Sequence, residues 1–133
     1  MARILVVDDD DAVRRTVCLA LERAGYGVVE QANALNAAPL MSDPTISLVV
    51  TDVMMPEMDG IELIREVKRN RCDLPIIAMS GGGSTNFQSL LRYCGALGAD
   101  RTLAKPFRAS ELIGLVQDLL GDGDEPPGDA ATR

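Results

Sequence analysis

The sequence predicts an α/β domain in which parallel strands alternate with helices. Short apolar runs recur along the chain, as expected of strands that are buried on both faces. Each run is followed by a stretch whose apolar residues repeat at helical spacing, and turn residues separate the two kinds of segment. Five such units indicate a parallel sheet with helices on both faces and right-handed connections.

The strands are predicted from the apolar runs, of which the second is the weakest. They cover residues 4–7, 28–29, 46–50, 74–79 and 101–104. The third run ends in Thr51-Asp52, the fourth is followed by Ser80 and three glycines, and the fifth comes just before Lys105. Polar residues therefore stand at the carboxyl ends of several strands.

The helices are predicted from apolar residues that recur every three or four positions. They cover residues 13–24, 34–41, 60–67, 87–94 and 111–120. Gly25 ends the first helix and Gly98 the fourth, because glycine commonly follows the last helical turn. Pro39 lies inside the second helix and weakens that prediction. Asp10 or Asp11 is expected to cap the first helix.

Composition predicts one globular domain, with neither a nucleic-acid partner nor insertion into a membrane. The chain has 133 residues, of which 47% are hydrophobic, and its net charge of -7 argues against contact with a nucleic-acid backbone. No apolar run approaches the roughly 20 residues that span a bilayer, and the N-terminal run is too brief for a signal peptide. Three cysteines without a CxxC pair fit a reducing cytoplasm. Residues 1–120 are expected to form the domain, and residues 121–133 a disordered acidic tail.

Acidic residues at the strand ends predict a phosphoryl-accepting site. Asp8 and Asp9 follow the first strand and Asp52 the third, and such ends converge on one crevice of an open sheet. Clustered carboxylates repel unless they share a cation, and hard oxygen ligands suit Mg²⁺, whereas a chain without histidine is a poor zinc binder. Lys105 could offset the charge that develops during phosphoryl transfer to Asp52, and the Ser80 hydroxyl could bind a phosphoryl oxygen.

Four segments resemble the receiver domains of bacterial two-component response regulators, the CheY-like family. They are ILVVDDD, VVTDVMMPEMDG, IIAMSGG and LAKPF, in the order and approximate spacing of that family. The resemblance extends from about Arg3 to Leu120 and implies a doubly wound (βα)5 flavodoxin-like sandwich with a five-stranded parallel sheet in the order 2-1-3-4-5. The absence of a DNA-binding or enzymatic segment predicts a stand-alone receiver.

The same resemblance implies a role for each site residue. Asp52 is the phosphoacceptor, Ser80 and Lys105 bind the phosphoryl group, and the Lys105-Pro106 bond is cis, against a base rate of roughly 5–6% for X-Pro bonds. The implied Mg²⁺ ligands are Asp9, Asp52 and the backbone carbonyl of Met54, with Asp8 assisting through water. The phosphodonor is a sensor histidine kinase or a His-containing phosphotransfer protein. The implied output is a protein contact or a relayed phosphate, and the only chemistry is self-phosphorylation and slow self-dephosphorylation.

Two departures from the family pattern affect the switch. Thr102 stands where many relatives carry Tyr or Phe, so we expect activation to move the backbone of the glycine-rich loop after Ser80 instead of an aromatic ring. Met54 and Gly82 occupy positions that tune the phosphate lifetime in the family. Neither can orient a hydrolytic water, which predicts slow dephosphorylation.

Three other functions fit the sequence less well than a phosphorylated receiver. A phosphatase with an aspartyl-phosphate intermediate needs a second aspartate where this chain has Met54. A flavodoxin-like cofactor binder needs backbone amides, not four acids, in its first loop. A pseudo-receiver, which keeps the fold and binds partners without phosphorylation, is the runner-up.

Overall fold

The computed structural model describes residues 3–53, 60–81 and 98–120. Several predictions fall outside these residues. They concern the fourth helix (residues 87–94), Met54, the loop glycines from Gly82 onward and the acidic tail (residues 121–133).

Within the described residues, five strands form one parallel sheet. The strands are β1 (Arg3–Val7), β2 (Gly27–Gln31), β3 (Ile46–Asp52), β4 (Ile76–Gly81) and β5 (Arg101–Lys105). They pair in the order β2-β1-β3-β4-β5, and every pairing is parallel. The parallel sheet and its implied order are therefore confirmed.

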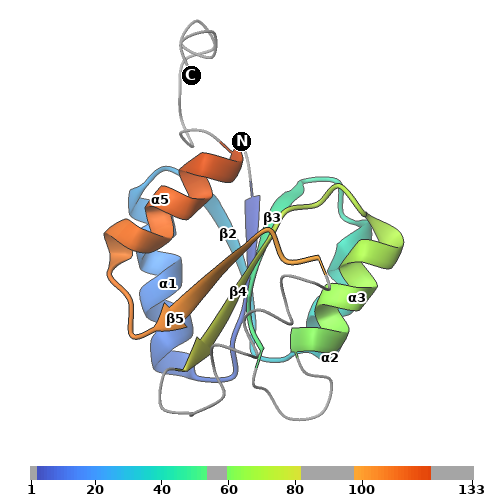
Figure 1. Cartoon of the computed structure of the whole chain (residues 1–133), viewed down its shortest axis with the longest axis horizontal. Coiled ribbons are helices and arrows are strands. Elements are labelled where there is room, and N and C mark those ends of the chain that lie inside the picture. Colours follow the sequence, from blue (N-terminus) through green and yellow to red (C-terminus); the bar gives the residue numbers. More distant parts are fainter. Residues whose placement is uncertain (1–2, 54–59, 82–97, 121–133) are drawn as a thin grey trace, which may run out of the picture.

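Helices cover both faces of the sheet. The described helical segments are α1 (Asp11–Arg23), α2 (Ala34–Ala37), the 3-10 helix η1 (Ala38–Ser42), α3 (Gly60–Asn70) and α5 (Ala109–Leu120). Helices α1 and α5 lie on one side of the sheet, and α2 and α3 lie on the other (Figure 1). The predicted end of the first helix is confirmed, since Gly25 follows its last turn with a φ of 98°.

The sheet separates two apolar clusters because side chains alternate along each strand. In β1, Leu5 and Val7 pack in the cluster beneath α2 and α3, whereas Ile4 and Val6 pack in the cluster beneath α1 and α5. All four side chains are fully buried. Continuous apolar runs in the sequence are thus explained by burial on both faces.

Most predicted elements begin or end a few residues from the observed bounds, and two of these differences have a clear physical cause. The predicted helix over residues 34–41 is divided into α2 and η1, because Pro39 cannot donate a helical hydrogen bond and lies in the first turn of η1. The predicted strand over residues 74–79 begins later, at Ile76. Pro75 precedes it, and the N–H of Leu74 donates to the Arg71 carbonyl at 3.0 Å in a turn. The strand also continues to Gly81, where it pairs with the end of β5.

Candidate functional site

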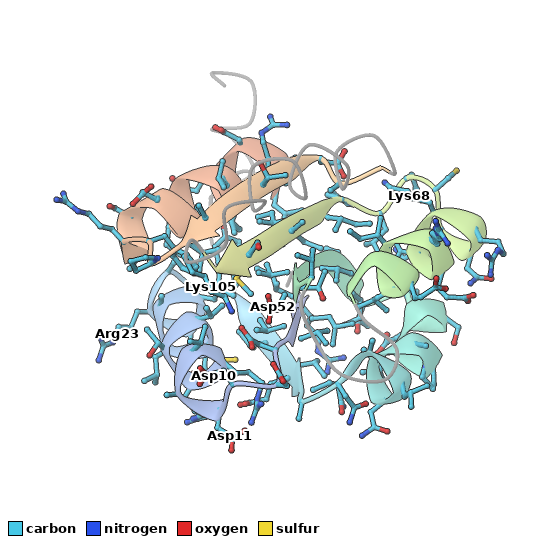
Figure 2. The ribbon with its side chains drawn as sticks, turned by 60° about the horizontal axis from the view of Figure 1, so that its bottom comes forward. Asp10, Asp11, Arg23, Asp52, Lys68 and Lys105 are labelled. Carbon is cyan, nitrogen blue, oxygen red and sulfur yellow. The ribbon has the colours of Figure 1, made fainter. Side chains whose placement is uncertain are left out.

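The candidate site lies at the carboxyl ends of the strands. Asp8 follows β1, Asp52 is the last residue of β3, and Lys105 is the last residue of β5. Strands β1 and β3 are neighbours, and their register pairs Val7 with Thr51, which brings the two aspartates that follow side by side. Figure 2 shows Asp52 and Lys105 close together at this edge.

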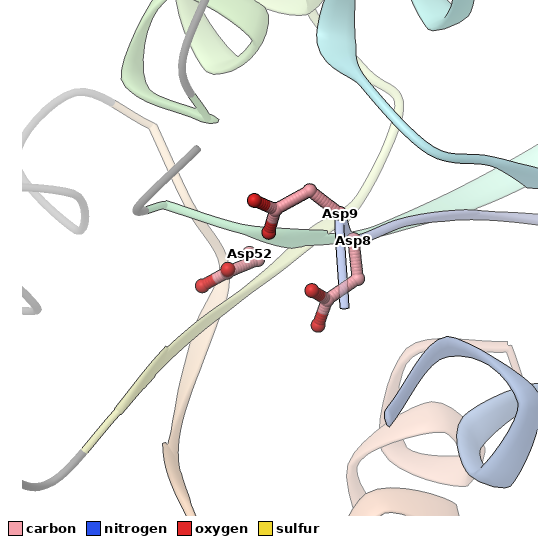
Figure 3. A group of neighbouring side chains, drawn as sticks. All are labelled: Asp8, Asp9 and Asp52. Carbon is pink, nitrogen blue, oxygen red and sulfur yellow. The ribbon is translucent and has the colours of Figure 1, made fainter. Parts of the chain in front are cut away.

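Three carboxylates form a cluster that fits a divalent cation. One oxygen each from Asp8, Asp9 and Asp52 lies within 4.8 Å of the others, and the three side chains gather at the ends of neighbouring strands (Figure 3). Asp8 is fully buried and Asp52 is 5% exposed, whereas Asp9 is open to solvent. Mg²⁺ takes hard oxygen ligands and keeps several waters, so a partly open set of carboxylates suits it.

Lys105 places its ammonium group against the buried carboxylates. Its Nζ atom lies 2.8 Å from Oδ2 of Asp8 and 3.6 Å from Oδ2 of Asp52. The side chain is only 17% exposed, so water screens these contacts weakly. A fixed positive charge at this place can attract an incoming phosphoryl group and offset the negative charge that gathers during its transfer.

Two hydrogen bonds, one from a side-chain hydroxyl and one between backbone groups, flank the Asp52 side chain along the strand. The Thr51 hydroxyl donates to the Asp52 carbonyl at 3.0 Å, and the N–H of Val53 donates to the Met79 carbonyl at 2.9 Å. The ladder between β3 and β4 thus continues past the acid and holds the Asp52 backbone in the sheet.

The turn from β1 to α1 is organised by aspartates. Asp10 is the N-cap of α1, where one side-chain oxygen accepts from the N–H groups of Ala12 at 3.0 Å and Val13 at 3.2 Å. Of the two capping candidates, Asp10 is therefore the one that the structure selects. Its own N–H donates to Oδ1 of Asp8 at 2.9 Å, which ties the cap to the acidic cluster.

The remaining predicted residues occupy three different places. Ser80 is buried within β4 and pairs with Ala104, one position before Lys105, so it lies at the same edge as the acids. The Lys105-Pro106 bond is cis, which confirms that expectation. Thr102 is exposed near the opposite end of β5 and lies outside the acidic cluster. Met54 is outside the described residues.

Sequence reasoning missed Arg14, which contacts the site from α1. Its Nη1 donates to the Asp8 carbonyl at 2.7 Å, and other nitrogens pair with Asp11 and Glu30. The hydrogen bond to Asp11 raises the pKa of Arg14, and the hydrogen bond from Arg14 lowers the pKa of Glu30. An arginine on an amphipathic helix usually lies at the surface, and its spacing of three from Asp11 could have indicated only the ion pair with that residue, not the contact with Asp8.

A pocket of about 460 Å³ opens beside Lys105, between the start of α1 and the segment that joins β5 to α5. Most of its wall is apolar, including Val13, Val17 and Phe107.

In the part of the chain that the structure describes, no helix is both long and apolar enough to cross a membrane.

Comparison with known proteins supports the same family. A family model, the response regulator receiver domain, matches residues 4–117. The chain is 36% identical over 120 residues to the response regulator receiver protein CpdR of Brucella abortus, and the match covers 90% of this chain and 98% of CpdR. It is 37% identical over 126 residues to the DNA-binding transcriptional regulator NtrC of Rhizobium meliloti, and there it covers 95% of this chain but only 25% of NtrC.

A solved structure has the same arrangement of elements. The receiver domain of NtrX from Brucella abortus superposes with a TM-score of 0.81 at 30% identity, covering 88% of this chain and 97% of that one. The family model extends over most of the chain and includes the strand ends that carry Asp8, Asp52 and Lys105. This chain therefore belongs to the family of response regulator receiver domains, the switch modules of two-component signalling.

Proposed function

We propose that this receiver domain is switched by phosphorylation of Asp52. The observation that carries the proposal is the placement of this nearly buried carboxylate, which lies beside two other aspartates and 3.6 Å from the Lys105 ammonium. The phosphodonor is a phosphohistidine of a sensor histidine kinase or of a His-containing phosphotransfer protein. We also propose a cytoplasmic location, which three cysteines without a CxxC pair support.

The transfer forms one bond and breaks another. An oxygen of the Asp52 carboxylate attacks phosphorus, the P–N bond of the phosphohistidine breaks, and its electron pair returns to the imidazole nitrogen, which takes up a proton. Lys105 offsets the negative charge on the equatorial oxygens during the step. A histidine donor supplies the phosphoryl group already activated, so the receiver needs to position it and to balance charge.

The carboxylate cluster would hold the Mg²⁺ that this chemistry requires. Asp9 and Asp52 are the proposed direct ligands, together with the backbone carbonyl of Met54, and Asp8 is proposed to act through a water. When bound, the ion neutralises charge on the phosphoryl oxygens. The donor set supports this assignment, since it offers three carboxylates and only one of them is well exposed to solvent.

The phosphorylated form is read out at the strand ends around Asp52. Ser80 and Lys105 are proposed to hold the new phosphoryl oxygens, and motion of Ser80 would shift the backbone that follows β4. Thr102 has no ring to rotate inward, so the signal passes through this backbone. Met54 and Gly82 offer no group that orients a water, so self-dephosphorylation is slow and is the only turnover that we assign to the chain.

The decisive experiment is intact-mass spectrometry after incubation with acetyl phosphate and Mg²⁺. We expect one phosphoryl adduct on the wild type, none on Asp52→Ala, and none with EDTA. The matched control is Asp73→Ala, which removes an exposed aspartate from the segment between α3 and β4 and should keep the adduct. A folded wild type that stays unmodified would contradict the proposal and favour the phosphorylation-independent pseudo-receiver.

A further inference from the structure

We propose that Arg14 is a positioning residue for the proposed Mg²⁺ site, acting through the backbone of Asp8. The inference rests on the proposed function, because it concerns the ion that phosphorylation of Asp52 needs. Arg14 lies in the first half of α1, and its side chain is only 13% exposed. Its contact with the site is to the Asp8 carbonyl, and the proposal concerns the effect of this contact on the neighbouring Asp9.

One guanidinium group joins three segments of the chain. Its Nη1 donates to the Asp8 carbonyl at 2.7 Å, its Nε to Glu30 of β2 at 3.0 Å, and its Nη2 to Asp11 at the start of α1 at 2.6 Å. The planar fork of arginine holds such donors in fixed directions. The turn between β1 and α1 is thereby fixed to both the helix and the neighbouring strand.

Every polar atom of Asp8 has a partner, and Arg14 supplies the one at its carbonyl. Its N–H donates to the Gln31 carbonyl at 3.2 Å, and its carbonyl accepts from Arg14 at 2.7 Å. Its Oδ1 accepts from the N–H of Asp10 at 2.9 Å, and its Oδ2 contacts Lys105 at 2.8 Å. The direction in which the chain leaves Asp8 is therefore fixed, and this direction determines where the exposed Asp9 carboxylate points.

The charge of Arg14 is balanced locally, which separates its geometric role from simple electrostatics. A bare cation beside the acidic cluster would oppose the binding of a second cation. Asp11 and Glu30 pair with Arg14, and Arg15 adds a contact to the other oxygen of Glu30 at 2.7 Å. Residues that orient metal ligands from outside the coordination shell typically change metal affinity by about 10–100-fold when they are replaced.

The test compares three variants with the wild type. Arg14→Ala removes the bridge, and Arg14→Lys keeps the positive charge but cannot reach three acceptors in fixed directions. Arg15→Ala is the matched control, since it removes one neighbouring arginine that also pairs with Glu30 but is 58% exposed and makes no described contact with Asp8. For each protein, the Mg²⁺ dissociation constant is measured by calorimetry, and thermal unfolding confirms the fold.

We expect Arg14→Ala to raise the Mg²⁺ dissociation constant about tenfold or more. Arg14→Lys should give an intermediate increase, and Arg15→Ala should stay within about twofold of the wild type. A second readout needs no metal. Without the hydrogen bond from Arg14 to the Asp8 carbonyl, the Asp8 carboxylate that accepts the Asp10 N–H is held less firmly. Hydrogen exchange of the Asp10 amide, measured by NMR in EDTA, should therefore accelerate in both Arg14 variants.

The outcomes separate this inference from the function on which it rests. If the wild type binds Mg²⁺ and is phosphorylated, while folded Arg14→Lys binds the ion as tightly and protects the Asp10 amide equally, only the role of Arg14 is overturned. Equal weakening by Arg15→Ala would also overturn it, since general charge loss would then explain the effect. A wild type that binds no Mg²⁺ would overturn both proposals. If Arg14→Ala does not fold, the result for Arg14→Lys decides.

Discussion

The two ends of the sheet both carry charged side chains, but they balance charge differently. At the amino ends of the strands, cations and carboxylates meet in single pairs. Arg3 contacts Asp43 at 3.3 Å, and Lys68 lies 3.6 Å from Asp100. Arg71 donates to the backbone carbonyls of Asp43 and of Ile46, both at 3.0 Å. Ion pairs and hydrogen bonds of charged side chains at this end thus hold loops against the strands.

At the carboxyl ends, acids outnumber the cation that faces them. Among the described residues, the carboxylates of Asp8, Asp9 and Asp52 cluster together, the Lys105 ammonium faces two of them, and those two are buried. Such an excess of negative charge costs stability and persists where function uses it. The balanced end therefore maintains the fold, whereas the unbalanced end holds a carboxylate cluster that could bind a metal ion.

The largest effect is expected from removing the cation at the acidic end. Lys105→Met should lower the free energy of unfolding by about 3 kcal/mol without metal, because it removes the cation that faces the buried carboxylates of Asp8 and Asp52. Mg²⁺ should restore part of this loss. Lys68→Met, at the balanced end, should cost about 1 kcal/mol with no response to Mg²⁺. Urea unfolding with and without Mg²⁺ measures both, and equal losses for the two variants would contradict the distinction between the ends.

A second pair of variants should separate metal binding from stability. Asp9→Asn removes the exposed carboxylate of the cluster, a proposed Mg²⁺ ligand, and should weaken Mg²⁺ binding about tenfold or more while leaving stability within about 0.5 kcal/mol. Asp100→Ala removes a carboxylate that accepts from the N–H of Ile76 at 2.8 Å, so it should cost about 1 kcal/mol of stability. Calorimetry and urea unfolding report the two quantities. A loss of Mg²⁺ affinity in Asp100→Ala would contradict the expectation that only the acidic end of the sheet binds the ion.

Lowering the pH should reduce the stability that carboxylates at both ends of the sheet contribute. Hydrogen bonding to Arg14 lowers the pKa of Glu30, and hydrogen bonding to the Thr45 hydroxyl lowers the pKa of Asp43. A carboxyl whose pKa is lower in the folded state stabilises the protein above its unfolded pKa, about 4 for these residues, and that contribution disappears as pH falls through the folded value. Glu30→Gln and Asp43→Asn should therefore lose less stability than the wild type between about pH 5 and pH 3. Unfolding curves that stay parallel to the wild type over this range would exclude the two contributions.

The smallest expected effect is a difference in reactivity between two cysteines, and it leaves the free energy of unfolding unchanged. Burial raises the pKa of Cys18 to about 11, so its thiol stays protonated and enclosed at pH 8. Cys72 is exposed at the balanced end, where its carbonyl accepts from Lys68. Iodoacetamide at pH 8, followed by peptide mapping, should modify Cys72 and spare Cys18. Modification of Cys18 in the folded protein would show that α1 opens more readily than its packing indicates.

Much of the fold could be predicted because buried parallel strands leave continuous apolar runs in the sequence. The order of the strands required the family resemblance, since apolar runs do not say which strands are neighbours. The predicted ends of strands and helices are wrong where backbone hydrogen bonding determines them. The run that begins at Leu74 is apolar throughout, yet Pro75 and the turn from Arg71 delay the start of β4, and β4 extends through Ser80 because β5 pairs with it.

The acidic cluster could be predicted residue by residue, whereas its support could not. Asp8, Asp9 and Asp52 follow apolar runs, so their convergence is a consequence of parallel strands. The contact between Arg14 and the Asp8 carbonyl depends on how α1 docks beside β2, and no spacing rule reports a side chain that reaches a backbone oxygen of another element. The roles of the site residues stay predictions until phosphorylation is measured.

The alternation of β1 between two apolar clusters also has a consequence for engineering. Hydrogen-bonded strands separate the clusters, so a cavity made beneath α3, for example by Val67→Ala, has few partners in common with one made beneath α5 by Val116→Ala. Their energetic costs should add in the double variant, whereas two cavities on the same face should interact. The sheet thus separates two apolar clusters whose side chains can be redesigned one cluster at a time. Strand β1 contributes to both clusters, and its pairing with β3 still places Asp8 beside Asp52.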